Sequence, residues 1–228
     1  MGHLIPERKD KDLEKTKCYI FAWGNEPFSA STLETMPTSD DFLIAADSGC
    51  EKMRGFGLCP DVVIGDMDSF DLERAKNIYP SADFIIYPPE KDWSDTKLCL
   101  DYAIEKGFRD IIMVGGLGGR LDHTLANINL LRYAYKKGVR LEINDGRNRA
   151  FFVKDDDFSV KRTYRMKYFS VIPFSENLEG VTMTGVKYPL DNAVVTRDDA
   201  ITLSNEITDR AAHVTIKSGE ALVIESSD

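Results

Sequence analysis

Up to about Gly146, the chain alternates short apolar runs with segments whose apolar residues recur every three or four positions. Short apolar runs bounded by turn residues indicate buried strands, and the longer period indicates helices. Strands that alternate with helices form βαβ units, so we expect a mostly parallel, doubly wound sheet with helices on both faces. The predicted strands cover residues 18–22, 42–46, 62–64, 84–87, 111–114 and 139–143.

Helices are predicted between these strands, and capping residues set their ends. Ser69 is suited to cap one helix, and Asp92 or Ser94 to cap the next, because short polar side chains accept hydrogen bonds from the first backbone N–H groups. Gly107 is suited to end this next helix, since glycine tolerates the left-handed backbone found there. The predicted helices cover about residues 30–36, 51–56, 69–77, 94–106 and 121–138, and the last carries Leu121, Leu125, Ile128 and Leu131 on one side.

The pattern changes after Gly146, where only short β-rich runs separated by turn residues follow. This pattern is typical of a small antiparallel sandwich or barrel. We therefore expect an α/β catalytic domain over residues 1–150 and a β-sandwich over residues 151–228. A domain of under about 80 residues has a thin core, so burial of one face against another subunit is expected. The predicted strands cover residues 151–153, 168–172, 181–183, 194–195, 201–203, 213–216 and 222–224, and the acidic run 155–157 is expected to be a solvated loop.

Charge and composition narrow the class of protein. The 228 residues carry a formal net charge of −9, which argues against nucleic-acid binding, since such surfaces are usually basic. No apolar run approaches the length of a membrane span, and the charged start lacks the apolar core of a signal peptide. The four cysteines are scattered, which fits neither a zinc site nor a disulfide framework. We expect a soluble, cytoplasmic protein.

Two carboxylates, Asp66 and Asp68, follow the predicted strand 62–64 directly. Ligands of open α/β sheets bind just beyond the carboxyl ends of the strands. Neighbouring carboxylates repel each other unless a cation lies between them, and oxygen ligands of this kind suit Mg²⁺ together with substrate phosphate. The alternative is a solvated acidic turn.

A glycine-rich loop, residues 115–119, precedes the last predicted helix of the first domain. The chain lacks the P-loop signature, and Leu121 stands where a dinucleotide-binding fingerprint requires its third glycine. A glycine run before a helix can nevertheless cradle phosphate with backbone N–H groups, and Arg120 could add a bidentate contact to phosphate oxygens. The alternative is a glycine-rich turn with a surface arginine.

Taken together, these segments closely resemble thiamine pyrophosphokinases. The first domain contains D-S-G at 47–49, G-D-M-D-S at 65–69, K-D-W-S-D-T-K at 91–97 and G-G-L-G-G-R-L-D-H-T-L-A-N at 115–127. The second contains L-E-G-V-T-M-T-G-V-K-Y-P-L at 178–190 and S-N-E at 204–206. The resemblance implies transfer of a pyrophosphoryl group from ATP to the hydroxyl of thiamine, which gives thiamine diphosphate and AMP. It also implies a Mg²⁺ requirement and a homodimer whose sites are shared between subunits.

The resemblance also assigns residues to roles. It implies that Ser204 and Asn205 contact thiamine. The proton of the thiamine hydroxyl could pass to Asp92, Asp95 or Asp122, a choice that the sequence leaves open. The implied Mg²⁺ ligands are Asp66, Asp68 and Asp95; the catalytic set is Asp68, Asp92, Asp95 and Asp122; and the implied ATP contacts are Asp47, Ser48, Lys97, Gly115, Gly116, Gly118, Gly119, Arg120 and His123.

Several of these residues also have purely structural interpretations. Asp95 could stabilise a helix start, and Arg120 and Asp122 could pair with each other. The only tryptophans, Trp23 and Trp93, belong to the first domain, so Tyr168 or Tyr188 would have to stack on thiamine, although both could be core aromatics. Two other functions use the same acidic residues: a Mg²⁺-dependent nucleotide hydrolase, and a thiamine- or nucleotide-binding sensor without catalysis.

Overall fold

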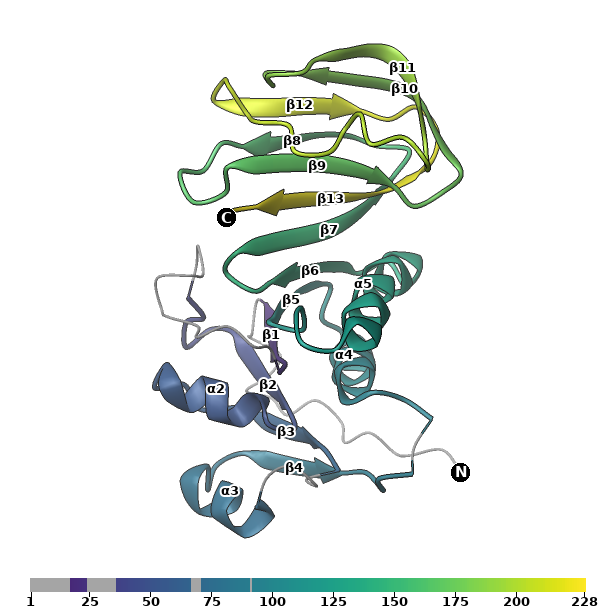
Figure 1. Ribbon diagram of the computed structural model, residues 1–228. Coiled ribbons are helices and arrows are strands. Elements are labelled where there is room, and N and C mark those ends of the chain that lie inside the picture. Colours follow the sequence, from purple (N-terminus) through teal and green to yellow (C-terminus); the bar gives the residue numbers. More distant parts are fainter. Residues whose placement is uncertain (1–16, 24–35, 67–70, 91) are drawn as a thin grey trace. The chain divides into compact units, whose positions relative to one another are not determined.

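The computed structural model describes residues 17–23, 36–66, 71–90 and 92–228, and it divides into two compact units, Met1–Gly146 and Arg147–Asp228 (Figure 1). The first unit contains a parallel sheet with helices, and the described part of the second contains strands without helices. This confirms the predicted fold class. None of the helices formed by the described residues has the length and apolar character needed to cross a bilayer.

The parallel strands of the first unit are hydrogen-bonded in the order β4-β3-β2-β1-β5-β6. The chain winds outward from β1 to β4 and then returns to β5 on the other side of β1, which makes the sheet doubly wound (Figure 1). Strands β1, β2 and β3 are buried at every position, which explains why they read as continuous apolar runs. The strands are β1 (Cys18–Phe21), β2 (Phe42–Ala46), β3 (Val62–Gly65), β4 (Asp83–Ile86), β5 (Asp110–Val114) and β6 (Arg140–Asn144).

Helices cover both faces of this sheet. Neighbouring side chains along a strand point to opposite faces, so the contacts of two successive residues show which helix lies on which face. Leu43 of β2 belongs to a core cluster with Met53 of α2, whereas the preceding residue, Phe42, stacks on Tyr102 of α4 with 6.5 Å between ring centroids. Helices α2 and α4 therefore lie on opposite faces. The helices are α2 (Gly49–Gly55), α3 (Leu72–Ile78), α4 (Asp95–Glu105) and α5 (Leu121–Lys136).

The helix caps confirm one prediction and correct another. Ser94 caps α4, since its Oγ accepts a hydrogen bond from the N–H of Lys97 at 3.4 Å. Asp71 caps α3 by accepting from two backbone N–H groups at 3.0 and 3.2 Å, so the prediction that Ser69 does so was wrong. Ser69 itself, like all of the predicted helix 30–36 except Met36, lies outside the described residues.

The buried face of α5 differs from the predicted one. Leu121 and Leu125 are 71% and 52% exposed. At about 100° per residue, these two leucines fall on the side of the helix away from the buried stripe. The stripe includes the polar Asn127. Because this residue interrupts the apolar pattern, the sequence did not predict the stripe as the buried face. Its residues are Asn127, Leu130, Leu131 and Ala134.

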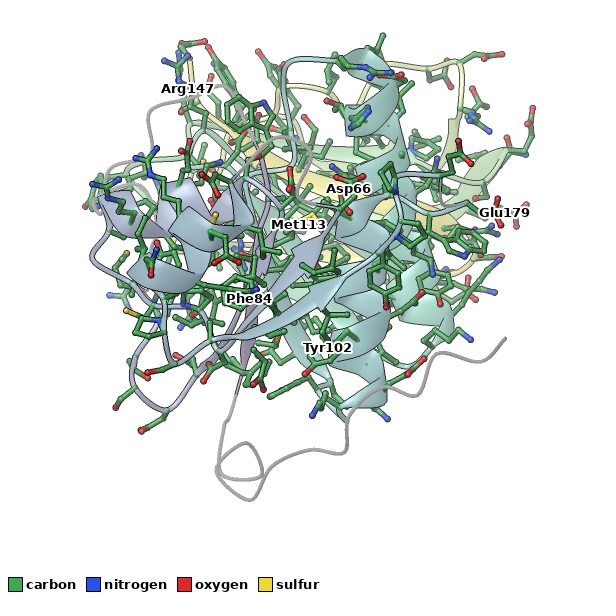
Figure 2. All side chains as sticks on the ribbon, turned by 90° about the horizontal axis from the view of Figure 1, so that it is seen from below. Asp66, Phe84, Tyr102, Met113, Arg147 and Glu179 are labelled. Atoms are coloured by element: carbon green, nitrogen blue, oxygen red, sulfur yellow. The ribbon has the colours of Figure 1, made fainter. Side chains whose placement is uncertain are left out.

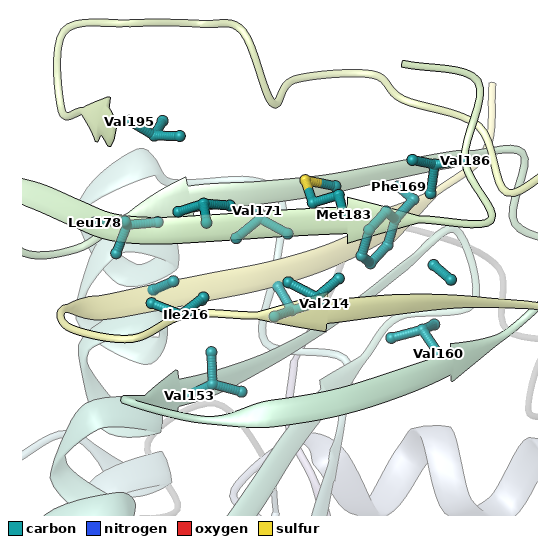
Figure 3. Packing of buried hydrophobic residues seen from close by; sticks show 14 residues of the cluster. Val153, Val160, Phe169, Val171, Leu178, Met183, Val186, Val195, Val214 and Ile216 are labelled. Atoms are coloured by element: carbon teal, nitrogen blue, oxygen red, sulfur yellow. The ribbon is translucent and has the colours of Figure 1, made fainter. Parts of the chain in front are cut away.

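The second unit is a β-sandwich. Strands β7, β13 and β9 pair antiparallel in this order, and β11, β10, β12 and β8 form a four-stranded antiparallel sheet. Both sets of strands contribute to one core, in which Val171 of β9 and Val214 of β12 are fully buried (Figure 3). The strands are β7 (Asn148–Lys154), β8 (Asp157–Lys161), β9 (Tyr168–Pro173), β10 (Asn177–Thr184), β11 (Leu190–Thr196), β12 (Ala211–Thr215) and β13 (Glu220–Ser226).

Two sequence predictions for the second unit were wrong. Residues 201–203 form a turn rather than a strand, and only the central Thr202 is buried, where its hydroxyl donates to the carbonyl oxygen of Val171 at 2.5 Å. Strand β8 was missed, because it begins within the acidic run and Val160 is its one buried residue. Residues 155–157 are exposed as expected, although Asp157 already belongs to β8.

Candidate active site

A cavity of about 310 Å³ lies within the first unit, at the carboxyl ends of its strands. Its walls are the segments that follow β1, β2 and β5, together with the starts of α4 and α5. The reversal of strand order between β1 and β5 is the usual position for a ligand in such sheets. The predicted residues that line the cavity are Asp47, Ser48, Asp95, Gly116, Gly118, Arg120 and His123.

Close backbone approaches bring together the strand ends beside this cavity. A Cβ on Gly49 would lie 2.0 Å from the carbonyl oxygen of Phe21, so α2 begins directly against the end of β1. A Cβ on Gly65 would lie 2.9 Å from the Cβ of Asp47, which follows β2 with a φ of 45°. The two glycines therefore allow the ends of β1, β2 and β3 to converge around the buried Asp47.

The glycine loop adopts a backbone that other residues rarely take. Gly115, Gly116, Gly118 and Gly119 all have φ between 69° and 87°. The N–H of Gly115 donates to the carbonyl of Asn144 at 2.9 Å, and that of Gly116 to Trp23 at 2.8 Å. These two N–H groups are thus engaged by backbone carbonyls, and what the two glycines contribute in this structure is the shape of the loop.

Arg120 and Asp122 form a bidentate pair at the start of α5, as the structural interpretation of the sequence allowed. The Nε–Oδ1 distance is 3.1 Å and the Nη2–Oδ2 distance is 2.6 Å. This pairing lowers the pKa of Asp122 and raises that of Arg120. Both side chains are exposed, and Arg120 lines the cavity together with His123.

The remaining charged candidates divide between the cavity and its surroundings. Asp95, the first residue of α4, lines the cavity, and Asp92 is exposed just before the helix. Lys97 is not among the lining residues: its Nζ pairs with Asp101 and lies 4.0 Å from the ring centroid of Tyr133. In this structure Lys97 therefore joins α4 to α5 rather than reaching the cavity.

The carboxylates supply the oxygen donors that suit Mg²⁺. Asp47 and Asp95 line one cavity, and Asp66 follows β3 directly (Figure 2). Asp68 lies outside the described residues, and the described part of the chain contains no group of three His, Cys, Asp or Glu side chains close enough to hold a metal. The donor chemistry fits a hard cation that completes its shell with substrate and water.

Thr96 and Asn127 also line the cavity, but they were not predicted as site residues. Both belong to the segments that carried the resemblance, yet a threonine in a first helical turn and an asparagine within a helix are unremarkable by themselves. The available signal was the position of Asn127, which shares the helical period of Leu130, Leu131 and Ala134.

Ser204 and Asn205 lie in the second unit. Ser204 is exposed with a φ of 54°, whereas Asn205 is only 1% exposed. The side-chain amide of Asn205 accepts from the N–H of Tyr188 at 3.0 Å and donates to its carbonyl at 2.8 Å. Asn205 thus fixes the backbone of Tyr188, whose side chain is 56% exposed and is therefore not a core aromatic.

Comparison with known proteins identifies the family. A model described as the catalytic domain of thiamin pyrophosphokinase matches residues 33–143, and one described as its vitamin B1 binding domain matches residues 157–223. The chain is 33% identical over 187 residues to the thiamine pyrophosphokinase of Bacillus subtilis, covering 81% of this chain and 87% of the relative.

Solved structures show the same likeness. The thiamine pyrophosphokinase structure from Bacillus subtilis superimposes with a TM-score of 0.84 at 30% identity, covering 93% of this chain and 99% of that one. The structure of the thiamin pyrophosphokinase from Geobacillus thermodenitrificans gives 0.81 at 31% identity, covering 93% and 98%. This chain belongs to the thiamine pyrophosphokinase family.

Proposed function

We propose that the protein transfers the pyrophosphoryl group of ATP to the hydroxyl of thiamine, giving thiamine diphosphate and AMP. The observation that carries this proposal is one cavity at the switch point of the sheet, lined by Asp47, Asp95 and the glycine loop, in a chain that matches both domains of the family. The hydroxyl oxygen attacks the β-phosphorus, and the bond from that phosphorus to the α–β bridging oxygen breaks. AMP leaves with the bridging oxygen.

Asp66, Asp68 and Asp95 are proposed to hold Mg²⁺, and of these three Asp95 lines the cavity. When bound, the ion would neutralise triphosphate charge that an acidic cavity otherwise repels. Arg120 and His123, which both line the cavity, are proposed to contact phosphate. Holding the hydroxyl and the phosphorus in line could supply up to about 7–11 kcal/mol of the barrier.

A carboxylate must accept the proton of the thiamine hydroxyl. Of the three candidates, Asp122 is paired with Arg120, and this pair lowers its pKa and weakens it as a base. Asp92 is exposed, whereas Asp95 lines the cavity at the start of α4. We therefore favour Asp95, with Asp92 as the alternative.

The second unit is proposed to bind the thiamine ring, with Ser204 as a contact and Asn205 as the support for Tyr188. An exposed aromatic ring is suited to a cationic thiazolium. We also propose a homodimer in the cytoplasm. Support for the dimer comes from five large apolar side chains of the second unit that are each more than half exposed, namely Tyr164, Tyr188, Val194, Ile201 and Leu203.

Phosphorus NMR of ATP, Mg²⁺ and the protein, with and without thiamine, tests the reaction. We expect AMP and thiamine diphosphate to appear together and only when thiamine is present. ADP with thiamine monophosphate would mean attack at the γ-phosphorus. Nucleotide breakdown without thiamine would indicate a hydrolase, and thiamine binding without turnover would indicate a sensor.

A matched pair of variants connects the reaction to the cavity. Asp95→Asn should lower turnover by about 100-fold or more, because it weakens both the proposed metal site and the proposed base. Asp83→Asn removes an exposed carboxylate at the start of β4, at the other end of the sheet, and should leave turnover unchanged. Equal turnover in both variants would remove Asp95 from the mechanism.

A further inference from the structure

Three hydrogen bonds connect the start of α4 to the glycine loop through one side chain of α5. The hydroxyl groups of Ser94 and Thr96 lie 3.1 Å apart. The Thr96 hydroxyl donates to Oδ1 of Asn127 at 2.8 Å, and Nδ2 of Asn127 donates to the carbonyl oxygen of Gly116 at 2.7 Å. The chain of bonds therefore starts beside Asp95 and ends at the loop.

The donor and acceptor groups allow only one direction of donation along this row of hydrogen bonds. The Gly116 carbonyl can only accept, so it must face the NH₂ of Asn127, and Oδ1 is left to accept from Thr96. Thr96 uses its single proton in that bond, and the bond to Ser94 is then one in which Ser94 donates. Hydrogen bonds aligned in this way polarise one another, and of the three bonds the one from Asn127 to Gly116 is buried, where this effect is strongest.

Burial makes Asn127 an unusual choice for a purely structural position. The side chain is only 6% exposed and lies in the stripe that α5 buries, where an apolar residue would pack without polar cost. Gly116 has a φ of 78°, and a Cβ there would lie 3.1 Å from Nδ2 of Asn127. The loop and the helix are therefore in direct contact at this point.

The hydrogen bond from Asn127 to the Gly116 carbonyl orients the whole peptide group between Gly116 and Leu117. The peptide group is planar, so the orientation of this carbonyl also sets the direction of the N–H of Leu117. At the other end, Thr96 follows Asp95 immediately. The chain of bonds thus sets the loop against the helix start that carries Asp95.

We propose that Asn127, together with Thr96, is a positioning residue that holds the glycine loop in register with Asp95. This inference rests on the function proposed above. The position of the glycine loop relative to Asp95 affects the rate only if the loop and this carboxylate act on the same triphosphate. An error of about 1 Å in such positioning can cost on the order of 100-fold in rate.

Two substitution pairs test the proposal. Asn127→Leu removes both bonds of the amide but keeps the branched heavy-atom skeleton of the side chain, and Asn129→Leu makes the same change at an exposed position of the same helix. Thr96→Val removes the hydroxyl at constant shape, whereas Thr96→Ser keeps it. Turnover and the KM values for ATP and thiamine are measured for each variant that folds, as judged by circular dichroism.

We expect Asn127→Leu to lower kcat by about 10- to 100-fold, with the KM for thiamine unchanged and Asn129→Leu equal to wild type. Thr96→Val should lower kcat about tenfold, and Thr96→Ser should have a kcat close to that of wild type. In the double variant the losses should not add, because either change breaks the same chain. Additive losses, or a Thr96→Ser variant as impaired as Thr96→Val, would overturn the proposal.

Hydrogen exchange provides a readout that is independent of activity. Asn127→Leu should accelerate exchange of the N–H groups of residues 116–119, and Asn129→Leu should not. Unchanged loop exchange in a folded Asn127→Leu protein would refute the positioning role even if activity fell. If wild-type protein makes no thiamine diphosphate but the loop exchange responds as expected, the proposed function fails while the structural connection stands.

Discussion

The ammonium group of Lys52 donates a hydrogen bond of 3.0 Å to the carbonyl oxygen of Ala22, the residue that follows β1. A Cβ on Gly115 would lie 2.6 Å from the same Nζ, so α2, the end of β1 and the glycine loop meet at this group. Burial lowers the pKa of Lys52 to about 8, although the carboxylate of Asp145 partly opposes the shift. A half-buried lysine therefore lies at the carboxyl ends of the strands, together with acids.

The lowered pKa predicts how stability depends on pH. The folded protein releases the Lys52 proton near pH 8, whereas the unfolded chain retains it up to about pH 10.5. In this window the unfolded state binds more protons, so the Lys52 contribution to the free energy of unfolding rises with pH. The difference in unfolding free energy, wild type minus Lys52→Met, should therefore increase from pH 8 to 10.5 in urea titrations.

Taking the difference between two proteins cancels the contributions of other titrating groups. Cys50, whose pKa is raised by burial to about 11, is present in both proteins, so its contribution cancels. Arg54→Met, an exposed change on the same helix, should give a difference from wild type that does not vary over this pH range. A Lys52→Met difference that is equally flat would contradict the predicted pKa.

Two glycines of α2 should respond in opposite ways to alanine. Gly49→Ala places a Cβ 2.0 Å from the backbone oxygen of Phe21, and this overpacking should cost about 3 kcal/mol of stability. Gly55→Ala meets no atom within 4 Å and should be neutral or stabilise by up to about 1 kcal/mol, because alanine favours the helix. Thermal and urea unfolding of both variants checks this, and equal effects would refute the close approach at Gly49.

The ion pair between Arg149 of β7 and Glu225 of β13 should be important for stability. The Nη1–Oε2 distance is 2.8 Å, and the Glu225 side chain is only 2% exposed. Glu225→Ala leaves the partly buried Arg149 charge, whose side chain is 20% exposed, without this partner and should cost up to about 3–5 kcal/mol. The exposed pair of Lys187 and Glu206 has the same length, and Glu206→Ala should leave the unfolding midpoint unchanged.

The measurement for this pair must report on the second unit. Neither tryptophan lies in residues 147–228, so tryptophan fluorescence follows the first unit. Hydrogen exchange of the β7 and β13 amides is the suitable probe, and it should accelerate in Glu225→Ala alone. Unchanged protection of these strands would show that the pair is dispensable.

Substitution of Asp122 tests whether this carboxylate only holds Arg120 in place or accepts the proton of the thiamine hydroxyl. Asp122→Asn releases Arg120 from its bidentate partner, which should raise the KM for ATP several-fold with a smaller effect on kcat, about tenfold at most. Asp95→Asn should be much more damaging to kcat. A kcat as low in Asp122→Asn as in Asp95→Asn would instead make Asp122 the base, despite its lowered pKa.

Local patterns were sufficient for most of the fold. Strands β1, β2 and β3 are fully buried in a parallel sheet, so their apolar runs are continuous and easily recognised. Strand β8 and the turn at residues 201–203 were misassigned because edge segments bury few residues, and β propensity then depends on neighbours that the sequence does not reveal.

The sequence by itself determined the order of strands and helices, the glycine and aspartate motifs at the strand ends, and the family. Only the tertiary structure decided which side chains share the cavity: Asp95 lines it, Lys97 pairs with Asp101, and Asn127 bonds to the loop. The physical reason is that motifs follow from local backbone requirements such as positive φ and helix caps. Contacts between α4, α5 and the loop join residues far apart in the sequence, such as Thr96 and Asn127, which are separated by 31 positions, and they depend on how the helices pack.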